Sequence, residues 1–307
     1  MKQIIKIGTR ESQLAVWQAM LVQSLLSKNG IASELVYIKS QGDVDTITPL
    51  YELGVQGIFT KTLDAALINK RIDIAVHSMK DVPTKLAIGI QQAAVLERAS
   101  FKDIFVYKNN PSFLEDENST AIIATSSIRR IGQWLHRYPK HTIENLRGNV
   151  NTRLQKVDKH KWNGAIFAAA GLERIGLRPE NSIDLDWMLP APAQGAITIL
   201  CRNDDTFPFD VCNALNDINT AICTKIERDF LRGLLGGCST PISALAETIN
   251  SHVIFKGNIC SPDGLKKIEI EKELKIKDSE SLGITVANEL LQNAEAIEII
   301  EGIRNAK

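Results

Sequence analysis

The first two-thirds of this chain alternates short apolar runs with longer amphipathic segments, and this alternation restricts the folds open to it. In one such segment Leu14, Trp17, Leu21 and Leu25 recur on a single face at the helical period. Strands and helices that follow each other in this way form α/β units, in which helices cover largely parallel sheets. The predicted strands are residues 4–7, 35–38, 72–76, 88–95, 104–107, 121–125, 164–169 and 196–201, and the predicted helices are 12–27, 59–69, 126–138 and 149–159.

The last third has a different pattern. A helix is predicted at residues 220–235, and strands near 253–259 and 265–271 precede a closing helix at 281–293. The two strands flank Ser261-Pro262-Asp263-Gly264, whose residue types are typical of a hairpin turn. We therefore expect a small α+β unit here, with domain boundaries near residues 97–102, 189–195 and 217–219.

The charge balance and the cysteines argue against several classes of protein. Lys+Arg and Asp+Glu both number 36 in the 307 residues, so no overall field attracts nucleic acid or a membrane. We expect no signal peptide and no membrane span, because no early or late apolar run is long enough. The five cysteines are widely spaced without a C-x-x-C pair, which favours a reducing cytoplasm. The five histidines show no zinc-type spacing, so no metal is expected.

Arginines occur at the predicted strand-to-helix junctions. The first turn of a helix favours acidic side chains because its N-terminus carries partial positive charge, yet Arg129 and Arg130 stand in one. Loops beyond the carboxyl ends of strands meet at the ligand crevice of α/β folds. The pattern predicts a receptor for several carboxylates, and a scatter of surface arginines is the alternative. The arginines concerned are Arg10, Arg129, Arg130, Arg147, Arg153 and Arg174.

Asp81 follows a predicted buried strand, next to Lys80 and before Pro83, and is the candidate for the chemistry. Nearby cations keep a carboxylate ionised, so that it can accept N–H groups, stabilise a developing cation or move a proton. The alternative is an aspartate that caps a turn. Asp73 is expected to be structural, and His77 is as consistent with a buried structural histidine as with a catalyst.

Cys238 lies in the stretch Gly236-Gly237-Cys238-Ser239-Thr240-Pro241, directly after a predicted helix. The glycines leave room around the thiol, and the proline prevents the helix from resuming. A thiol in such a loop suggests reactivity or covalent attachment, whereas a small apolar residue under a turn is the alternative.

Several stretches, in this order, resemble the porphobilinogen deaminase (hydroxymethylbilane synthase) family. They cover nearly the whole chain and are residues 7–15 (IGTRESQLA), 77–83 (HSMKDVP), 125–130 (TSSIRR), 146–154 (LRGNVNTRL), 168–174 (AAAGLER), 194–196 (QGA) and 235–238 (LGGC).

The resemblance implies two similar α/β domains of the type II periplasmic-binding-protein kind, residues 1–98 with 196–217 and residues 99–195, and a small α+β domain of residues 218–307. It implies a dipyrromethane cofactor joined to Cys238 by a thioether. Four porphobilinogen molecules are added to it head to tail with loss of ammonia, through an azafulvenium cation, and the product is released by hydrolysis. A cytoplasmic monomer is expected.

The resemblance also assigns roles to residues. Asp81 is the catalytic residue. The implied cofactor-binding residues are Cys238, Lys80, Ser126, Arg129, Arg130, Arg147 and Gly148, and the implied substrate-binding residues are Arg10, Ser12, Arg153, Arg174, Gln194 and Phe59. Two positions depart from the family pattern: Gln56 stands where many members have lysine, and Pro192-Ala193 replaces a more usual glycine-bearing stretch.

Two other functions are consistent with parts of this pattern. A non-catalytic two-lobed binding module for a polycarboxylate fits the α/β pattern, but it gives no role to Cys238 or Asp81. A nucleic-acid binder fits the arginines, but the zero net charge and the lack of interleaved aromatic and basic residues argue against it.

Overall fold

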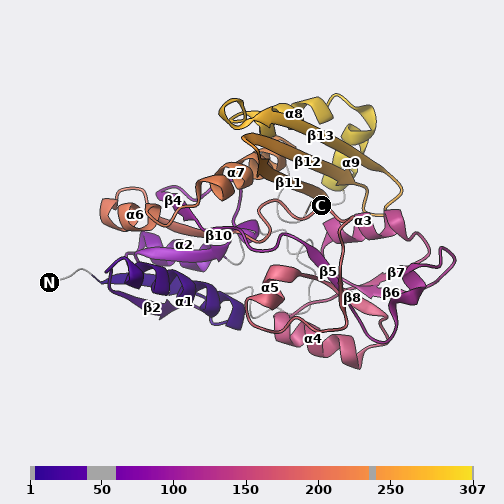
Figure 1. Ribbon diagram of the computed structural model, residues 1–307, viewed down its shortest axis with the longest axis horizontal. Helices are drawn as coiled ribbons and strands as arrows, with labels where there is room; N and C mark the ends of the chain where they lie inside the picture. Colours follow the sequence, from indigo (N-terminus) through magenta and orange to yellow (C-terminus); the bar gives the residue numbers. More distant parts are fainter. Residues whose placement is uncertain (1–3, 40–59, 235–239, 306–307) are drawn as a thin grey trace.

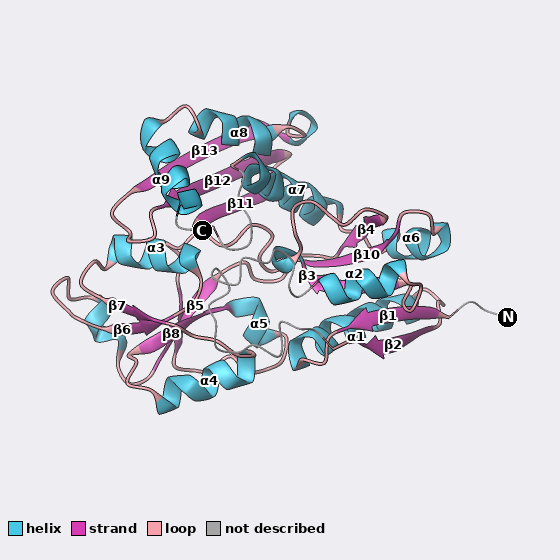
Figure 2. Cartoon of the chain, turned by 180° about the vertical axis from the view of Figure 1, so that it is seen from behind, coloured by secondary structure: helices cyan, strands magenta, loops and turns pink. Residues whose placement is uncertain are grey.

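The computed structural model describes residues 4–39, 60–234 and 240–305. Within these ranges the strands form two five-stranded sheets and one three-stranded sheet. Each sheet and its helices make one unit, and the first and second units lie side by side with the third packed against both (Figures 1 and 2).

The first unit has its central sheet in the order β2-β1-β3-β10-β4. Its strands are β1 (Ile5–Thr9), β2 (Ser33–Tyr37), β3 (Ile74–Ser78), β4 (Ile90–Val95) and β10 (Ile197–Arg202). The first three are parallel neighbours, whereas β10 runs antiparallel to both β3 and β4.

The second unit repeats this arrangement in the order β7-β6-β8-β5-β9. Its strands are β5 (Asp103–Tyr107), β6 (Ile122–Ala124), β7 (Thr142–Glu144), β8 (Gly164–Ala168) and β9 (Ser182–Asp184). Here β6, β7 and β8 are parallel, and β5 is the antiparallel strand between β8 and β9. The expectation of largely parallel sheets is thus confirmed, since four of the five strands in each sheet run the same way. The one antiparallel strand of each sheet is the strand that arrives from the other unit.

Two crossover segments connect these units, residues 96–102 before β5 and 185–196 before β10. They run close together, since Ala99 N donates to Gly195 O at 3.2 Å and Arg98 Nε donates to Gln194 O at 2.8 Å. Gly195 has a φ of +87°, and a Cβ there would stand 2.6 Å from Ala99 O. This position therefore requires glycine both for its backbone conformation and for the close approach.

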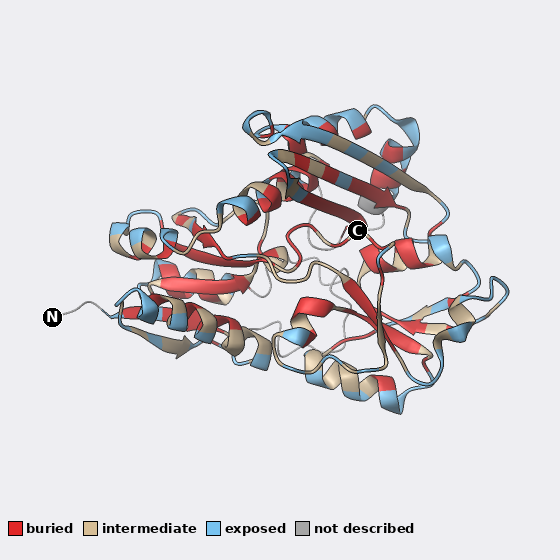
Figure 3. Ribbon diagram, viewed as in Figure 1, coloured by how far each residue is buried: buried red, intermediate tan, exposed pale blue. Residues whose placement is uncertain are grey.

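Helices bury the faces of both sheets. The helix α1 (Gln13–Lys28) packs its buried residues Ala19 and Val22 against one face of the first sheet, and α2 (Lys61–Ile68) covers the other face with Leu63 and Leu67. The remaining helices of these units are α3 (Ile128–Arg137), α4 (Val150–Lys159), α5 (Ala169–Glu173) and α6 (Thr206–Asn213). Figure 3 shows that the central strands are buried, as expected for sheets covered on both faces.

The third unit is a three-stranded antiparallel sheet with helices packed on it. Its elements are α7 (Ile218–Gly233), β11 (Ile242–Ile249), β12 (His252–Cys260), β13 (Lys267–Lys275), α8 (Leu282–Leu290) and α9 (Ala294–Asn305). In its core the rings of Phe230 and Phe255 meet at a centroid distance of 5.1 Å. The predicted turn joins β12 to β13, where Gly264 has a φ of +76° and Gly264 N donates to Ser261 O at 3.0 Å.

The predicted α/β fold class with a small α+β C-terminal unit is confirmed. Every strand and helix predicted from periodicity is present among the described residues, with bounds shifted by a few positions. The strands and α-helices that the pattern missed are β7, β9, β11, α5, α6 and α9. Of these, β7 and β9 have only three residues each, too few to show a period.

Candidate active site

The carboxyl ends of parallel strands from the first and second units face each other. In the first unit β1 and β3 end at Thr9 and Ser78, and in the second unit β6 and β8 end at Ala124 and Ala168. Side chains bridge the two units at this point, since Asn151 Nδ2 donates to Gln13 Oε1 at 2.9 Å. The candidate site residues extend from these strand ends, as the α/β pattern predicted.

Lys80 and Asp81 lie on a single turn of 3₁₀-helix, η2 (Met79–Asp81), directly after β3. The turn begins with Met79 N donating to Ala196 O at 3.0 Å, which ties it to the second crossover segment. Arg228 of α7 holds its far side, where the guanidinium donates to the carbonyls of Val82 at 2.9 Å and Pro83 at 2.6 Å. The third unit thus helps to position the loop that carries Asp81.

Cations from both units surround this loop. Burial lowers the pKa of Lys80 to about 8; the carboxylates of Asp81 and Asp103 oppose that shift, whereas Arg130 and Arg129 add to it. These mutual effects require the five side chains to lie within electrostatic reach of one another.

The same cluster extends along α4. Burial, together with the charges of Arg130 and Arg147, lowers the pKa of Arg153 to about 10, and Asp81 opposes the shift. Among the described residues the cluster therefore has two carboxylates, Asp81 and Asp103, and an excess of positive charge from Lys80, Arg129, Arg130, Arg147 and Arg153. Such an excess, partly removed from water, is suited to bind a ligand with several carboxylates.

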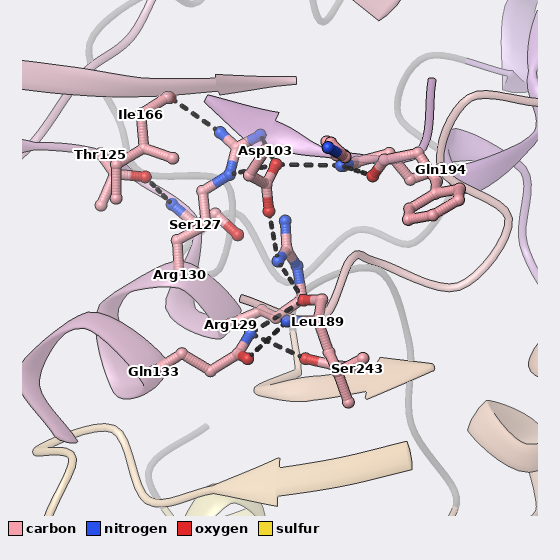
Figure 4. A network of polar contacts seen from close by, with 12 residues as sticks. Asp103, Thr125, Ser127, Arg129, Arg130, Gln133, Ile166, Leu189, Gln194 and Ser243 are labelled. Atoms are coloured by element: carbon pink, nitrogen blue, oxygen red, sulfur yellow. Dashed lines mark hydrogen bonds and ion pairs between the residues drawn. The ribbon is translucent and has the colours of Figure 1, made fainter. Parts of the chain in front are cut away.

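Arg129 and Arg130 do lie in the first turn of α3, as predicted, but their guanidiniums are held by Asp103 (Figure 4). Arg130 Nη2 and Nε donate to Asp103 Oδ1 at 2.7 and 3.1 Å, and Arg129 Nη1 is ion-paired with Oδ2 at 2.7 Å. Asp103 is fully buried, and the two arginines lower the pKa of its carboxyl far below the usual range despite that burial. The sequence analysis missed Asp103. The signal that marks it is an acidic residue opening the apolar run of β5.

The loop before α4 uses part of the predicted cofactor-binding set for its own structure. Ser126 Oγ donates to Leu146 O at 2.7 Å and accepts from Leu146 N at 2.9 Å. Gly148, with a φ of +114°, accepts from Arg153 Nε through its carbonyl at 2.7 Å. These bonds fix the backbone on either side of Arg147, which is buried.

On the side of the first unit, Ser12 is the N-cap of α1, as predicted, and accepts from Ala15 N at 3.4 Å. His77 is buried beside Arg10, and burial together with the charge of Arg10 lowers its pKa to about 4, so that the ring is neutral at pH 7. Asp73 has a structural role, because it accepts from Lys6 N at 2.9 Å and pairs with Arg202 at 3.2 Å.

Arg174 follows α5 and is engaged by the crossover segment and by α1. Its Nη2 donates to Gly195 O at 2.6 Å, and its guanidinium lies over the ring of Trp17 at 5.8 Å. Burial lowers its pKa to about 10, with Glu173 opposing the shift.

Gln194 connects the units. Its Oε1 accepts from Lys80 Nζ at 3.2 Å, and its Nε2 donates to Asp103 Oδ1 at 2.9 Å and to Phe101 O at 2.8 Å. Next to Gln194 lies Ala193, one of the positions that depart from the family pattern. It has a φ of +61° and donates its N–H to Glu227 Oε2 at 2.6 Å.

Cys238, Phe59 and Gln56 lie outside the described residues. The four cysteines inside them are buried, and burial raises their pKa to about 11 for Cys201 and about 12 for Cys212, Cys223 and Cys260. These four thiols are therefore poor nucleophiles. In the described ranges no helix is long and apolar enough to cross a membrane, and no group of His, Cys, Asp and Glu is arranged to hold a metal ion.

Comparison with known protein families shows the family of this chain. A family model described as "Porphobilinogen deaminase, dipyromethane cofactor binding domain" matches residues 5–208, and one described as "Porphobilinogen deaminase, C-terminal domain" matches residues 221–292. The chain belongs to the porphobilinogen deaminase family. The porphobilinogen deaminases of Acidithiobacillus ferrooxidans strains ATCC 53993 and ATCC 23270 are each 40% identical to it over 308 residues, covering 98% of this chain and 99% of theirs.

Solved structures similar to this porphobilinogen deaminase family member include the periplasmic VFT2 domain of Bordetella pertussis BvgS and the methionine binding protein MetQ. The first is 13% identical, covers 71% of this chain and 89% of its own, and has a TM-score of 0.43. The second is 15% identical, covers 69% and 89%, and has a TM-score of 0.43. The resemblance seen in the sequence is confirmed by the family match, and the dipyrromethane cofactor is part of the description of the matching domain.

Proposed function

We propose that this chain is a hydroxymethylbilane synthase, a transferase of tetrapyrrole (haem) biosynthesis. It joins four porphobilinogen molecules head to tail on a covalently bound dipyrromethane, loses ammonia at each addition, and releases hydroxymethylbilane by hydrolysis. Membership of the porphobilinogen deaminase family supports this function. The structural observation that carries it is the cluster in which two carboxylates, Asp81 and Asp103, lie among five cations contributed by two α/β units.

The cations match the charge of the substrate. Each porphobilinogen ring carries an acetate and a propionate, so every added ring brings two carboxylates into the site. Lys80, Arg147 and Arg153 supply positive charge from three different loops and helices. Guanidinium groups bind carboxylates through two parallel N–H bonds, which orients each ring as well as attracting it. We assign the remaining carboxylate contacts to Arg10, Arg129, Arg130 and Arg174, with Ser12, Ser126, Gly148, Gln194 and Phe59 as further contacts.

Asp81 is suited to the bond-forming step. It is half-buried on a turn whose backbone is held by Arg228, which donates to Met79 O at 3.2 Å. Loss of ammonia from porphobilinogen leaves a cation, and a fixed carboxylate stabilises such a charge more than mobile water does. The same oxygens can accept a pyrrole N–H and hold the proton that leaves when the new carbon–carbon bond forms.

The residues present fit a dipyrromethane in chemical character. Two linked pyrrole rings carry four carboxylates, and the described cluster around Lys80 and Arg153 has more cations than carboxylates. When bound, the group supplies the pyrrole to which the first substrate is joined. We propose Cys238 as its thioether anchor, and the four other cysteines, buried and with raised pKa, are unsuited to that role.

The non-catalytic binding module is disfavoured by the family match over both parts of the chain. We further propose that the enzyme acts as a cytoplasmic monomer and binds no nucleic acid, in keeping with its zero net charge.

Intact mass spectrometry tests the proposal. The purified chain is expected to exceed its sequence mass by two linked pyrrole units, and Cys238→Ser should abolish the increment. Asp81→Asn should keep the increment and the fold but lose most of the turnover of porphobilinogen. An unmodified chain that is fully active would refute the assignment, and normal turnover in Asp81→Asn would remove Asp81 from its role.

A further inference from the structure

We propose that Asp103 is a positioning residue of this enzyme: its buried carboxylate holds Arg129 and Arg130 and, through the amide of Gln194, sets Lys80 beside Asp81. This inference rests on the proposed function. It assigns a role to a fully buried residue that contacts, directly or through one amide, three of the cations proposed to bind substrate and cofactor.

The position of Asp103 in the chain explains why it can act on both units. It is the first residue of β5, directly after the crossover segment of residues 96–102. The second crossover segment brings Gln194 against it, with Gln194 Nε2 donating to Asp103 Oδ1 at 2.9 Å. A single side chain thereby meets α3 of the second unit on one side and the crossover to the first unit on the other (Figure 4).

The contacts of Asp103 occupy both carboxylate oxygens. Oδ1 accepts Arg130 Nη2 at 2.7 Å and Nε at 3.1 Å, in addition to Gln194, and Oδ2 is ion-paired with Arg129 Nη1 at 2.7 Å. The other bonds of the guanidiniums go to backbone carbonyls, from Arg130 to Ile166 O at 2.9 Å and from Arg129 to Leu189 O at 2.8 Å. Each guanidinium is thus fixed by at least two partners, which is what a precisely oriented carboxylate receptor requires.

The number of charges shows that Asp103 does not neutralise Arg129 and Arg130 completely. One carboxylate faces two buried guanidiniums, so this group of three retains a net positive charge. Removing the carboxylate would leave two buried like charges about as close to each other as before, and they would repel each other with no counterion. Asp103 therefore keeps two cations together without cancelling their attraction for an anionic ligand.

The amide of Gln194 extends this effect to Lys80. A glutamine presents a donor at one end and an acceptor at the other, and here Nε2 meets Asp103 while Oε1 accepts from Lys80 Nζ at 3.2 Å. Among the described residues, the charged groups that act on Lys80 include Asp81, Arg130, Asp103 and Arg129. Because Asp103 is one of the two that favour the protonated amine, loss of its charge should lower the pKa of Lys80.

The test compares Asp103→Asn with Asp73→Asn in the full chain as purified. Asp73 is a matched control, since it also pairs with a buried arginine, Arg202, but at the opposite end of β3 from Lys80. The pH dependence of Lys80 acetylation by acetic anhydride, read by peptide mass spectrometry, reports the midpoint of its titration. We expect this midpoint to fall in Asp103→Asn and to stay unchanged in Asp73→Asn.

Steady-state kinetics give the second readout. A misplacement of about 1 Å among binding groups costs roughly 100-fold in rate, so kcat should fall by about tenfold or more in Asp103→Asn and remain normal in Asp73→Asn. A lowered Lys80 midpoint together with reduced kcat supports the proposal. An unchanged midpoint, or a kcat loss equal in the two variants, overturns it.

If Asp103→Asn does not fold, Gln194→Met provides the test, because it leaves the ion pairs of Asp103 with Arg129 and Arg130 intact and removes the side-chain bonds of Gln194 to Lys80, Asp103 and Phe101. A displaced Lys80 midpoint then supports the proposal, and an unchanged midpoint overturns it. The acetylation readout needs no turnover. A wild-type chain without dipyrromethane and without activity would therefore contradict the proposed function while the Lys80 midpoints still decide the role of Asp103.

Discussion

Replacing Glu227 by glutamine should destabilise this protein more than the corresponding amide substitution, Glu→Gln or Asp→Asn, at any other described acidic residue of the third unit. Glu227 lies on α7 and is fully buried. Its Oε1 accepts Arg98 Nη1 at 2.6 Å and Ala246 N at 2.8 Å. Its Oε2 accepts Arg98 Nη2 at 3.1 Å and Ala193 N at 2.6 Å. The side chain therefore joins the third unit to both crossover segments.

The size of the effect follows from these four bonds. The glutamine amide turns one acceptor into a donor, so two of the four hydrogen bonds are lost and an N–H faces another N–H. The guanidinium of Arg98, whose side chain is 11% exposed, loses its counterion at the same time. Breaking a buried ion pair by removing one partner costs about 3–5 kcal/mol. At about 2 °C for each kcal/mol in a chain of this size, the midpoint of thermal unfolding should fall by about 6–10 °C.

Differential scanning calorimetry measures this, with Glu271→Gln as the matched control. Glu271 also lies in the third unit, and its Oε1 is ion-paired with Lys256 Nζ at 3.3 Å. Both side chains of this pair are at least half exposed, so the pair is not buried like that of Glu227. An exposed pair contributes about 0–1 kcal/mol, so the control should shift the midpoint by about 2 °C or less. If the two variants shift the midpoint equally, the reasoning about Glu227 is wrong.

Three further predictions concern the site and its supports. Burial lowers the pKa of Lys80 to about 8, so its positive charge is lost as the pH rises through that value. KM for porphobilinogen should therefore increase between pH 7 and 9, and Lys80→Met should lack this increase. Arg228→Met removes the hydrogen-bond donors to the carbonyls of Val82 and Pro83, which hold the loop that carries Asp81. We therefore expect kcat to fall with little change in KM. Equal changes in kcat and KM would argue against this role of Arg228. Gly195→Ala should lower the thermal midpoint by several degrees, because its Cβ would stand 2.6 Å from Ala99 O. The control Gly176→Ala also has a positive φ, of +66°, but its Cβ would meet open space. It should cost only about 1 kcal/mol, or about 2 °C in the thermal midpoint.

The secondary structure was largely predictable because it depends on local periodicity. Long amphipathic segments such as α1 and buried apolar runs such as β3 show their period within a few residues. Short strands such as β9 carry no such signal, since their pairing is decided by the neighbouring strand β5. The antiparallel direction of β10 could not be predicted from the sequence either, because it depends on where the chain returns from the second unit.

The candidate site was predictable where its residues follow a strand directly. Lys80 and Asp81 after β3, and Arg147 and Arg153 around the start of α4, were found from their place in the α/β pattern. Their assignment to cofactor and substrate stays a prediction. Asp103 was not found, because its partners Arg129 and Arg130 are 26 and 27 positions away and no local pattern links them.

By itself the sequence determined that strands and helices alternate, that arginines and one aspartate follow strand ends, and that the chain belongs to the porphobilinogen deaminase family. The tertiary structure decided how these groups are held. Buried carboxylates at Asp103 and Glu227 bring together cations and crossover segments that are far apart in the chain. The physical reason is that a charge removed from water is tolerated only with partners in the right geometry, and the partners are chosen by the packing of the three units.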